Sequence, residues 1–213
     1  MVPGRTWPPD HYGPAMPPAR EAGTQHISVL DADGVGCALT TTINTSFGSG
    51  LVVESLGIVL NNQMDDFALA PGVPNAYGLV GAEANGMKPG KRPLSSMSPA
   101  VLLDPEGHVA LVVGGSGGSF IPSAVLQVIV AIVDFGLDPA DAVALPRFHH
   151  QWIPDELVLE PGFPDDVARA LRARGHRVVY REGFSAVQVV RAAGGQAEGA
   201  SDPRKDGRPS SVW

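Results

Sequence analysis

The sequence predicts an α+β fold, in which strands concentrated early in the chain pack against helices that come later. Three observations carry this prediction. Short apolar runs separated by turn residues occupy the first half, a longer apolar segment spans 119–135, and strands and helices do not alternate regularly. With 213 residues, 44% of them hydrophobic, the chain can bury one large core. We therefore expect one layered domain.

A flexible tail and a β-hairpin are expected at the start of the chain. Residues 1–23 are rich in proline and poor in aliphatic side chains, which is typical of an extended tail. The composition changes at Thr24. From there, segments 24–31 and 37–43 have the pattern of two strands around the turn sequence Asp31-Ala-Asp-Gly34.

Further strands and a long loop are expected next. Residues 57–60 form a short apolar strand, and 101–103 and 108–113 form a second hairpin around a turn at 104–107. Between these strands, residues 70–90 are rich in Gly, Pro and Ala. This composition predicts a long loop of the kind that serves as a lid.

Helices are expected in the second half. Segment 119–135 is apolar on nearly every face, which indicates a helix sandwiched between two layers. Asp138 and Pro139 begin a second helix as N-cap and first-turn proline. A third helix over 164–174 ends at Gly175. Closing strands are expected at 156–160, 177–180 and 184–191.

Composition excludes several functional classes. The net charge of −7, without a Lys/Arg cluster, argues against nucleic acid or an anionic membrane as partner. The longest apolar stretch, 121–133, is shorter than the roughly 20 residues of a membrane span, and the N-terminus lacks the pattern of a signal peptide. The single cysteine, Cys37, is expected to be buried, and the neighbouring His149 and His150 point apart. We predict no metal site.

Four polar segments lie where apolar runs end, and hydrophobicity does not explain them. They are Thr-Thr-Thr-Ile-Asn at 40–44, Asn-Asn-Gln-Met-Asp-Asp-Phe at 61–67, Lys-Arg-Pro-Leu-Ser-Ser-Met-Ser-Pro at 91–99 and Gly-Gly-Ser-Gly-Gly-Ser at 114–119. Hydroxyls, amides, carboxylates and a glycine-rich backbone gathered at strand ends suit acyl transfer, which needs a nucleophile, groups that grip a polar substrate and an oxyanion hole.

The candidate nucleophile is Thr24, which follows Gly23 and opens the first strand. If the chain were cut before it, the new α-amino group could take the proton of the threonine hydroxyl. Thr42 and Asn44 alternate on one face of the second strand. By pattern alone, they are equally compatible with a solvated strand edge.

The remaining candidates are binding groups. Asp66 can pair with a substrate ammonium, and Gln63 can donate or accept a hydrogen bond beside it. Ser95 and Ser96 are short hydroxyl donors. The alternatives are an Asx-rich turn for 61–67 and a Ser/Pro turn for 91–99.

Two glycines, Gly117 and Gly118, offer backbone N–H groups just before the apolar helix. There they could stabilise a developing oxyanion. A phosphate-binding loop is excluded because no Gly-Lys-Ser/Thr sequence follows, whereas a simple strand–helix turn stays open.

These four segments, with 146–157 and 199–204, resemble the small catalytic subunit of the γ-glutamyltranspeptidase (glutathione hydrolase) family of N-terminal-nucleophile hydrolases. The similarity covers residues 24 to about 206. The chain departs from the family pattern at Gln25, Ser116 and Phe120. The resemblance implies a four-layer αββα sandwich, of which only the small-subunit part (24–213) is present, preceded by the tail of the large-subunit region.

The resemblance also implies a cut between Gly23 and Thr24 and a set of roles. Thr24 is then the nucleophile, Thr42 helps to activate it, Gly117 and Gly118 form the oxyanion hole, Asn44, Ser95 and Ser96 hold the substrate α-carboxylate, and Gln63 and Asp66 bind its α-amino group. The implied donors are glutathione and other γ-glutamyl compounds. The γ-glutamyl group would pass to water, an amino acid or a dipeptide, without metal or organic cofactor.

The implied partner is the large subunit in a heterodimer, and the implied location is periplasmic or extracellular. Two alternatives stay open. A related acylase could act on cephalosporin side chains or poly-γ-glutamate, or the chain could be a fragment that is inactive and poorly soluble without the large subunit.

Overall fold

The computed structural model describes residues 23–70 and 72–211, and the predicted tail therefore lies outside the described residues except for Gly23. The strands are β1 (Thr24–Leu30), β2 (Gly36–Thr42), β3 (Val52–Val53), β4 (Ile58–Val59), β5 (Ala100–Leu103), β6 (Val109–Ser116), β7 (Phe148–His149), β8 (Leu157–Leu159), β9 (Val178–Tyr180), β10 (Ala186–Ala193) and β11 (Gln196–Ser201). The helices are α1 (Ile121–Val133), α2 (Pro139–Ala144) and α3 (Asp165–Ala173), with short 3₁₀ turns at Gln63–Asp66, Glu83–Asn85 and Gly118–Phe120. The predicted α+β class is confirmed.

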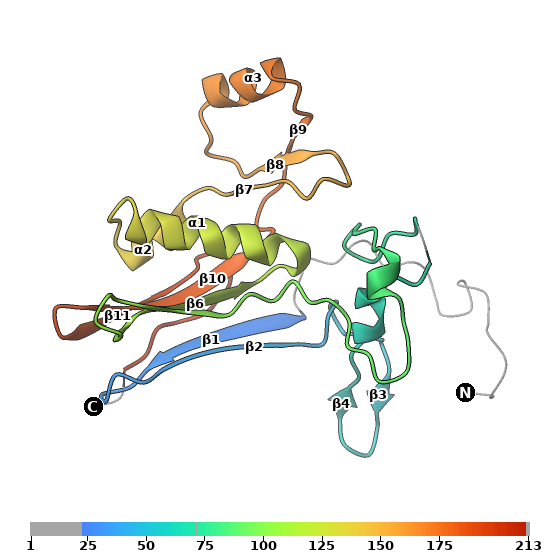
Figure 1. Ribbon diagram of the computed structural model, residues 1–213, viewed down its shortest axis with the longest axis horizontal. Helices are drawn as coiled ribbons and strands as arrows, with labels where there is room; N and C mark the ends of the chain where they lie inside the picture. Colours follow the sequence, from blue (N-terminus) through green and yellow to red (C-terminus); the bar gives the residue numbers. More distant parts are fainter. Residues whose placement is uncertain (1–22, 71, 212–213) are drawn as a thin grey trace.

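Three layers position the site (Figure 1). An antiparallel sheet of order β11-β10-β6-β5 forms the middle layer. Helices α1 and α2 cover one of its faces, and the β1–β2 hairpin packs on the other through β6 and β10. The described chain therefore forms a helix layer, a sheet and a second sheet, in that order, as expected for part of the sandwich that the resemblance implies.

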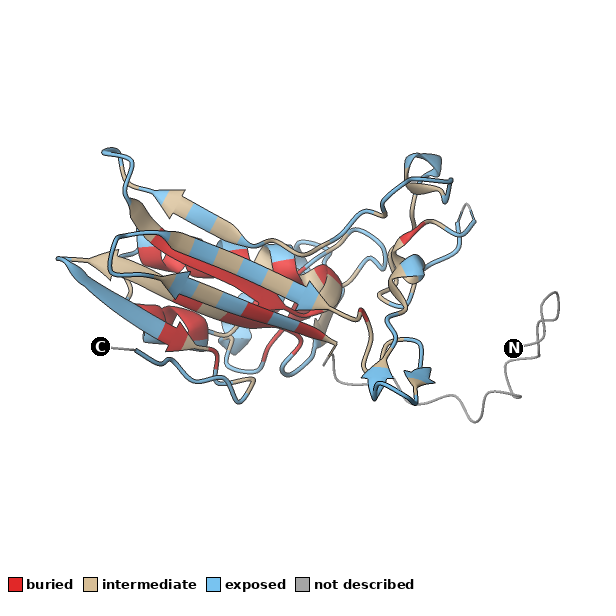
Figure 2. Cartoon of the chain, turned by 90° about the horizontal axis from the view of Figure 1, so that it is seen from below, coloured by how far each residue is buried: buried red, intermediate tan, exposed pale blue. Residues whose placement is uncertain are grey.

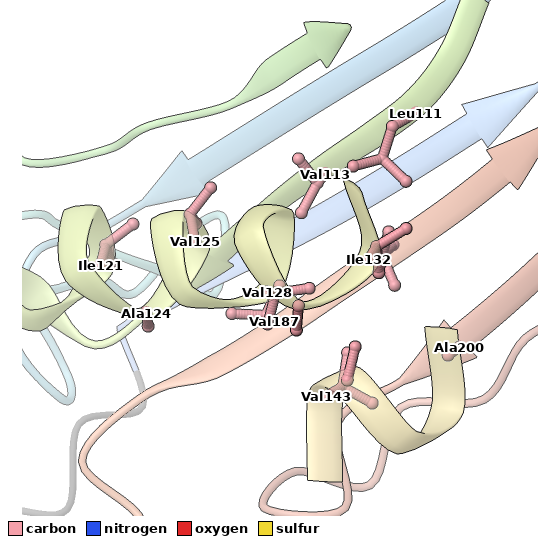
Figure 3. Close-up of a cluster of buried hydrophobic side chains, with 13 residues drawn as sticks. Leu111, Val113, Ile121, Ala124, Val125, Val128, Ile132, Val143, Val187 and Ala200 are labelled. Atoms are coloured by element: carbon pink, nitrogen blue, oxygen red, sulfur yellow. The ribbon is translucent and has the colours of Figure 1, made fainter. Parts of the chain in front are cut away.

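The hydrophobic core lies between α1 and the sheet (Figure 3). Alternate residues of β6 and β10 point towards the helix, and Val113 and Val187 are fully buried there against Val128. Each such side chain contributes about 1.5–3 kcal/mol by leaving water. The prediction that this helix is sandwiched between layers is wrong for the described chain. Its outer side leaves Leu126 60% and Val133 59% exposed, because only one face meets the sheet.

Polar residues line the inner face of the β1–β2 hairpin. The His26 ring lies against the backbone of Gly114 in β6, where a Cβ would come within 2.2 Å of it. His26 Nδ1 lies 2.7 Å from Thr40 Oγ1 and Nε2 lies 3.1 Å from Ser28 Oγ, whose hydroxyl donates to Gln188 O. This network holds the hairpin on the sheet with the ring in its neutral form, and burial lowers the pKa of His26 to about 4.

Acidification is expected to weaken the fold through His26. The pKa of His26 is about 6.5 in the unfolded chain and about 4 in the folded chain, so the unfolded chain binds the proton more readily. The stabilisation by neutral His26 is therefore complete above pH 6.5 and is lost as the pH falls from 6.5 to 4. Between pH 7 and pH 4.5 the loss is at most about 2.5 kcal/mol. Urea unfolding of the wild type and of His26→Gln at both pH values measures it. Equal pH dependence in the two proteins would contradict this expectation.

The outer face of the hairpin is exposed, as the stripes along β1 and β2 show (Figure 2). Ile27 is 53%, Val29 47% and Leu39 53% exposed. Cys37, which the sequence placed in the interior, is also exposed, because it lies on this outer face and not on the face that meets β6. An uncovered apolar sheet face of this kind indicates an interaction surface.

A small lobe of β7, β8, β9 and α3 stands on the far side of α1 (Figure 1). It is tied to the sheet by a buried ionic cluster that joins two of the sequence segments singled out above. Arg147 is paired with Asp202, and Arg204 with both Asp202 and Glu160. Asp202 also accepts a hydrogen bond from Val187 N at 2.8 Å. The segments 146–157 and 199–204 therefore meet to hold the end of the chain in place.

The sequence missed β3, β7 and β11 and extended several strands by a residue or two, such as 156–160 for β8. The hairpins, the three helices and the N-cap at Asp138, which accepts from Asp141 N at 2.9 Å, are confirmed. Within the described residues, no helix has the length and apolar character that crossing a membrane requires.

Candidate active site

A cavity of about 170 Å³ opens where β1 begins and β2 ends. It is lined by every site residue predicted from the sequence except Gly117. These residues are Thr24, Thr42, Asn44, Gln63, Asp66, Ser95, Ser96 and Gly118. They come from separate segments of the chain, and the fold brings them to one place because all of these segments end or turn at this edge of the layers.

The two threonines form the centre of the site. Thr24 is 3% exposed, and its Oγ1 lies 2.9 Å from Thr42 Oγ1 in the neighbouring strand, where the two residues are paired directly. Thr42 donates its single hydroxyl proton to Gly23 O at 3.1 Å and accepts from Asn44 N at 2.8 Å. The proton between the two hydroxyls therefore belongs to Thr24, so Thr42 is placed to accept from it.

Asn44 adopts a backbone conformation that L-residues rarely take, with φ of 74°. It is 3% exposed, and its side-chain amide donates to Asn62 O at 3.2 Å. Its own carbonyl accepts from the Tyr77 hydroxyl at 2.9 Å. These contacts hold a strained residue in the cavity wall two positions after Thr42.

Asp66 and Gln63 lie on the short 3₁₀ turn that follows Asn62. Gln63 Nε2 donates to Asp66 Oδ2. Burial raises the pKa of Asp66, the hydrogen bond from Gln63 opposes that shift, and the neighbouring Asp65 adds to it. A cationic group in the cavity would offset the burial of this carboxylate. Asp65 itself accepts from Ala76 N at 3.0 Å, which is a structural role.

Ser95 and Ser96 lie on an extended segment without regular structure before β5. Asn85 ties this segment to the Asp66 turn, because its side chain accepts from Leu94 N at 2.9 Å and donates to Asp66 O at 2.7 Å. The sequence reasoning missed Asn85. Its only mark in the sequence is an Asn-Gly pair inside the predicted loop, which any turn would also carry.

Gly117 and Gly118 connect β6 to α1 and are both in the left-handed region, with φ of 135° and 56°. A Cβ on Gly117 would come within 2.7 Å of Phe184 O, and one on Gly118 within 2.2 Å of the Tyr77 ring. Both positions therefore require glycine for space as well as for φ. Gly118 lines the cavity. Gly117 precedes it in the chain and is not part of the lining.

The predicted lid segment contributes Asn75, Tyr77 and Asn85 to the cavity lining. Tyr77 connects two parts of the fold, because its carbonyl accepts from Gln151 Nε2 at 3.2 Å. Ser119 Oγ donates to Gln151 Oε1 at 2.8 Å. The sequence reasoning did not single out Tyr77. It also missed Lys205, whose Nζ donates to the backbone carbonyl of Thr24 at 2.9 Å.

The adjacent histidines, His149 and His150, make local structural contacts. His149 is buried, with Nδ1 2.7 Å from Ser123 Oγ and Nε2 2.9 Å from Gln151 Oε1, and its burial lowers its pKa. His150 lies 3.1 Å from exposed Asp155. In the part of the chain that the structure describes, no group of three or more His, Cys, Asp or Glu side chains is placed to hold a metal ion.

Comparison with known proteins gives a consistent result. The family model of gamma-glutamyltranspeptidase matches residues 2–212. The glutathione hydrolase proenzyme of Escherichia coli is 50% identical over 190 residues, which are 89% of this chain and 33% of that protein. The glutathione hydrolase proenzyme of Pseudomonas aeruginosa is 42% identical over 94% of this chain and 36% of its own length. The chain therefore spans about a third of the curated relatives it matches.

Solved structures agree with this result. A Helicobacter pylori gamma-glutamyltranspeptidase mutant superposes with a TM-score of 0.81 at 44% identity, covering 86% of this chain and 100% of that one. The Pseudomonas nitroreducens gamma-glutamyltranspeptidase complexed with L-DON gives 0.83 at 42% identity, covering 88% and 99%. The match of sequence and fold means that this chain belongs to the γ-glutamyltranspeptidase family.

Proposed function

We propose that the chain is the catalytic part of an enzyme that transfers γ-glutamyl groups from glutathione and related donors. The observation that carries this proposal is the pairing of Thr24 with Thr42 in one wall of a cavity that also contains Asp66. A buried nucleophile and a partly buried carboxylate at one cavity suit a donor that has both an acyl group and an ammonium.

The reaction begins with cleavage between Gly23 and Thr24, which frees the α-amino group of Thr24. This amine takes the proton of the Thr24 hydroxyl while Oγ1 attacks the γ-carbonyl carbon of the donor. The backbone N–H groups at Gly117 and Gly118 stabilise the oxyanion. The amine returns the proton to the leaving nitrogen, which leaves a γ-glutamyl ester on Thr24. Attack by water hydrolyses this ester and releases glutamate. Attack by the amino group of an amino acid or dipeptide transfers the γ-glutamyl group to that acceptor.

The donor binds through its α-carbon substituents. Asp66 pairs with the α-ammonium, with Gln63 beside it, and the α-carboxylate accepts from Ser95, Ser96 and the Asn44 amide. The segment 72–90 forms part of the wall over this end of the cavity, and we interpret it as the lid. The residues carry this chemistry without a metal or organic cofactor.

The partner that we propose is the large subunit of the same enzyme. The exposed apolar face of the β1–β2 hairpin, with Ile27, Val29 and Leu39, is the surface that it would cover. On the chain alone this face stays in water, which favours low solubility and low activity. The periplasmic or extracellular location implied by the family remains a prediction.

Asp66→Asn is expected to remove the preference for an α-ammonium. A γ-glutamyl and a glutaryl p-nitroanilide differ only in that amine, and the glutaryl group is also the side chain on which a cephalosporin acylase acts. In the wild type the γ-glutamyl donor should have the higher kcat/KM. The variant should lose about 10–100-fold on that donor, as expected for a charged hydrogen bond, and little on the glutaryl donor.

The control is Asp65→Asn, which changes the neighbouring carboxylate but can still accept from Ala76 N. It should leave the ratio of the two kcat/KM values unchanged. A wild type that prefers the glutaryl donor would favour the related acylases. A wild-type complex that cleaves neither donor would favour the inactive fragment.

A further inference from the structure

The strongest unassigned contact at the site is made by Lys205, near the end of the described chain. Its Nζ donates to the carbonyl oxygen of Thr24 at 2.9 Å, across 181 positions of sequence. The carbonyl oxygen and the α-nitrogen of one residue are separated by only two carbon atoms. The ammonium of Lys205 therefore lies within about 6.5 Å of the Thr24 nitrogen.

The turn that carries Lys205 is built into the core. Asp202 is 1% exposed, and Oδ1 accepts from Arg204 N at 3.0 Å while its carbonyl accepts from Lys205 N at 3.2 Å. The other carboxylate oxygen is held by Arg147 and by Val187 N. The backbone of Lys205 is therefore fixed by the buried ionic cluster, and its side chain extends from there to β1.

We propose that Lys205 is a positioning residue for the nucleophile, which holds the Thr24 carbonyl and keeps the adjacent α-amino group in its neutral, proton-accepting form. This inference rests on the proposed function, because only a processed chain has that amino group. A nearby positive charge disfavours a second one, so the amine loses its proton at a lower pH than it otherwise would. An N-terminal nucleophile needs this neutral amine as its base.

The other charged groups near Thr24 do not supply this effect. His26 lies two residues along the same strand face, and its lowered pKa leaves it neutral near pH 7. Asp66 lines the same cavity, and its negative charge would favour the protonated amine. Asp202 and Arg204 are paired with each other, and Arg204 also with Glu160. Among the residues that the structure describes, Lys205 is the cation that directly contacts Thr24.

The test is the pH dependence of kcat/KM for a γ-glutamyl p-nitroanilide, measured on the processed complex. In Lys205→Met the acidic limb should move to higher pH by about 0.5 to 2 units, the range given by a unit charge at this distance between watery and protein-like surroundings. Lys205→Arg should restore most of the wild-type position. The exposed Lys88→Met removes the same charge outside the cavity lining and should leave the limb unchanged.

A second measurement uses only the wild type and covers the case in which Lys205→Met does not fold. Raising the salt concentration from 0.05 to 0.5 M should move the acidic limb towards higher pH, because Lys205 is only partly buried and its field is screened. An unmoved limb in Lys205→Met, or in the salt series, would overturn the inference while the proposed function stands. A processed wild type that is inactive on γ-glutamyl donors would instead overturn the proposed function. In that case the rate at which an amine-reactive reagent labels Thr24, followed against pH, tests Lys205 directly. A wild type without a free Thr24 amine would overturn both.

Discussion

Thr24→Ala is expected to abolish γ-glutamyl transfer, with a fall in kcat of at least about 10³-fold. The reason is that no other hydroxyl replaces it. Thr42, its hydrogen-bond partner, lies within the chain at the end of β2 and therefore has no free α-amino group of its own to act as base. Initial rates on a γ-glutamyl p-nitroanilide, with the chain co-expressed with the proposed large subunit, measure the effect.

Thr24→Ser is the matched control for this prediction. It keeps the hydroxyl and the α-amine but loses the methyl group, so it should retain a measurable fraction of the activity. An alanine variant as active as the serine variant would show that Thr24 is not the nucleophile.

Arg147→Met is expected to lower the free energy of unfolding by about 3–5 kcal/mol, because it removes the cation at Oδ2 of the buried Asp202 carboxylate and leaves only Arg204, at Oδ1, to balance that charge. Arg147 and Asp202 are both 1% exposed. Burial lowers the pKa of Arg147, and the attraction of Asp202 opposes this shift. The Asp202 carboxylate therefore helps to keep the buried guanidinium charged. Urea unfolding of the purified protein measures the change.

The double variant Arg147→Met with Asp202→Leu separates the pair from the loss of packing. Removing both charges should recover part of the stability, since the unbalanced Asp202 charge is gone, whereas Val187 N and Arg204 N lose the acceptor that Asp202 gave them. A single Arg147→Met variant within about 1 kcal/mol of wild type would contradict the role of the cluster.

Local sequence predicted the elements that local interactions determine. The turn at 31–34, the proline and N-cap of α2 and the apolar length of α1 each have a short-range physical cause. Strand β11 has none. Its sequence of Gln, Ala, Glu and Gly has little strand preference, and it becomes a strand because β10 pairs with it across Gly194 and Gly195.

The same distinction holds for the candidate site. The polar strings around Thr42, Asp66 and Ser95 are continuous in sequence, so reading along the chain found them. The contacts of Tyr77 and Lys205 are not continuous, since they reach Asn44 and Thr24 across 33 and 181 positions. Only the fold brings Tyr77 to the cavity and Lys205 to Thr24.

The outer faces of the β1–β2 hairpin and of α1 are where the burial predicted from the sequence was wrong. An apolar sequence predicted burial for Cys37 and for all sides of α1, but hydrophobicity does not tell which chain covers a face. The described residues leave these faces in water. The exposed side of the β1–β2 hairpin is therefore the surface where a partner is expected.

The measurement that tests the central claim most directly is the intact mass and N-terminal sequence of the protein, purified after co-expression with the proposed large subunit. Self-processing predicts a new chain that begins at Thr24, and the same cut should be absent in Thr24→Ala. An uncleaved chain that retains Gly23 joined to Thr24 in the wild type would contradict the account, because no α-amine would then exist to serve as the base.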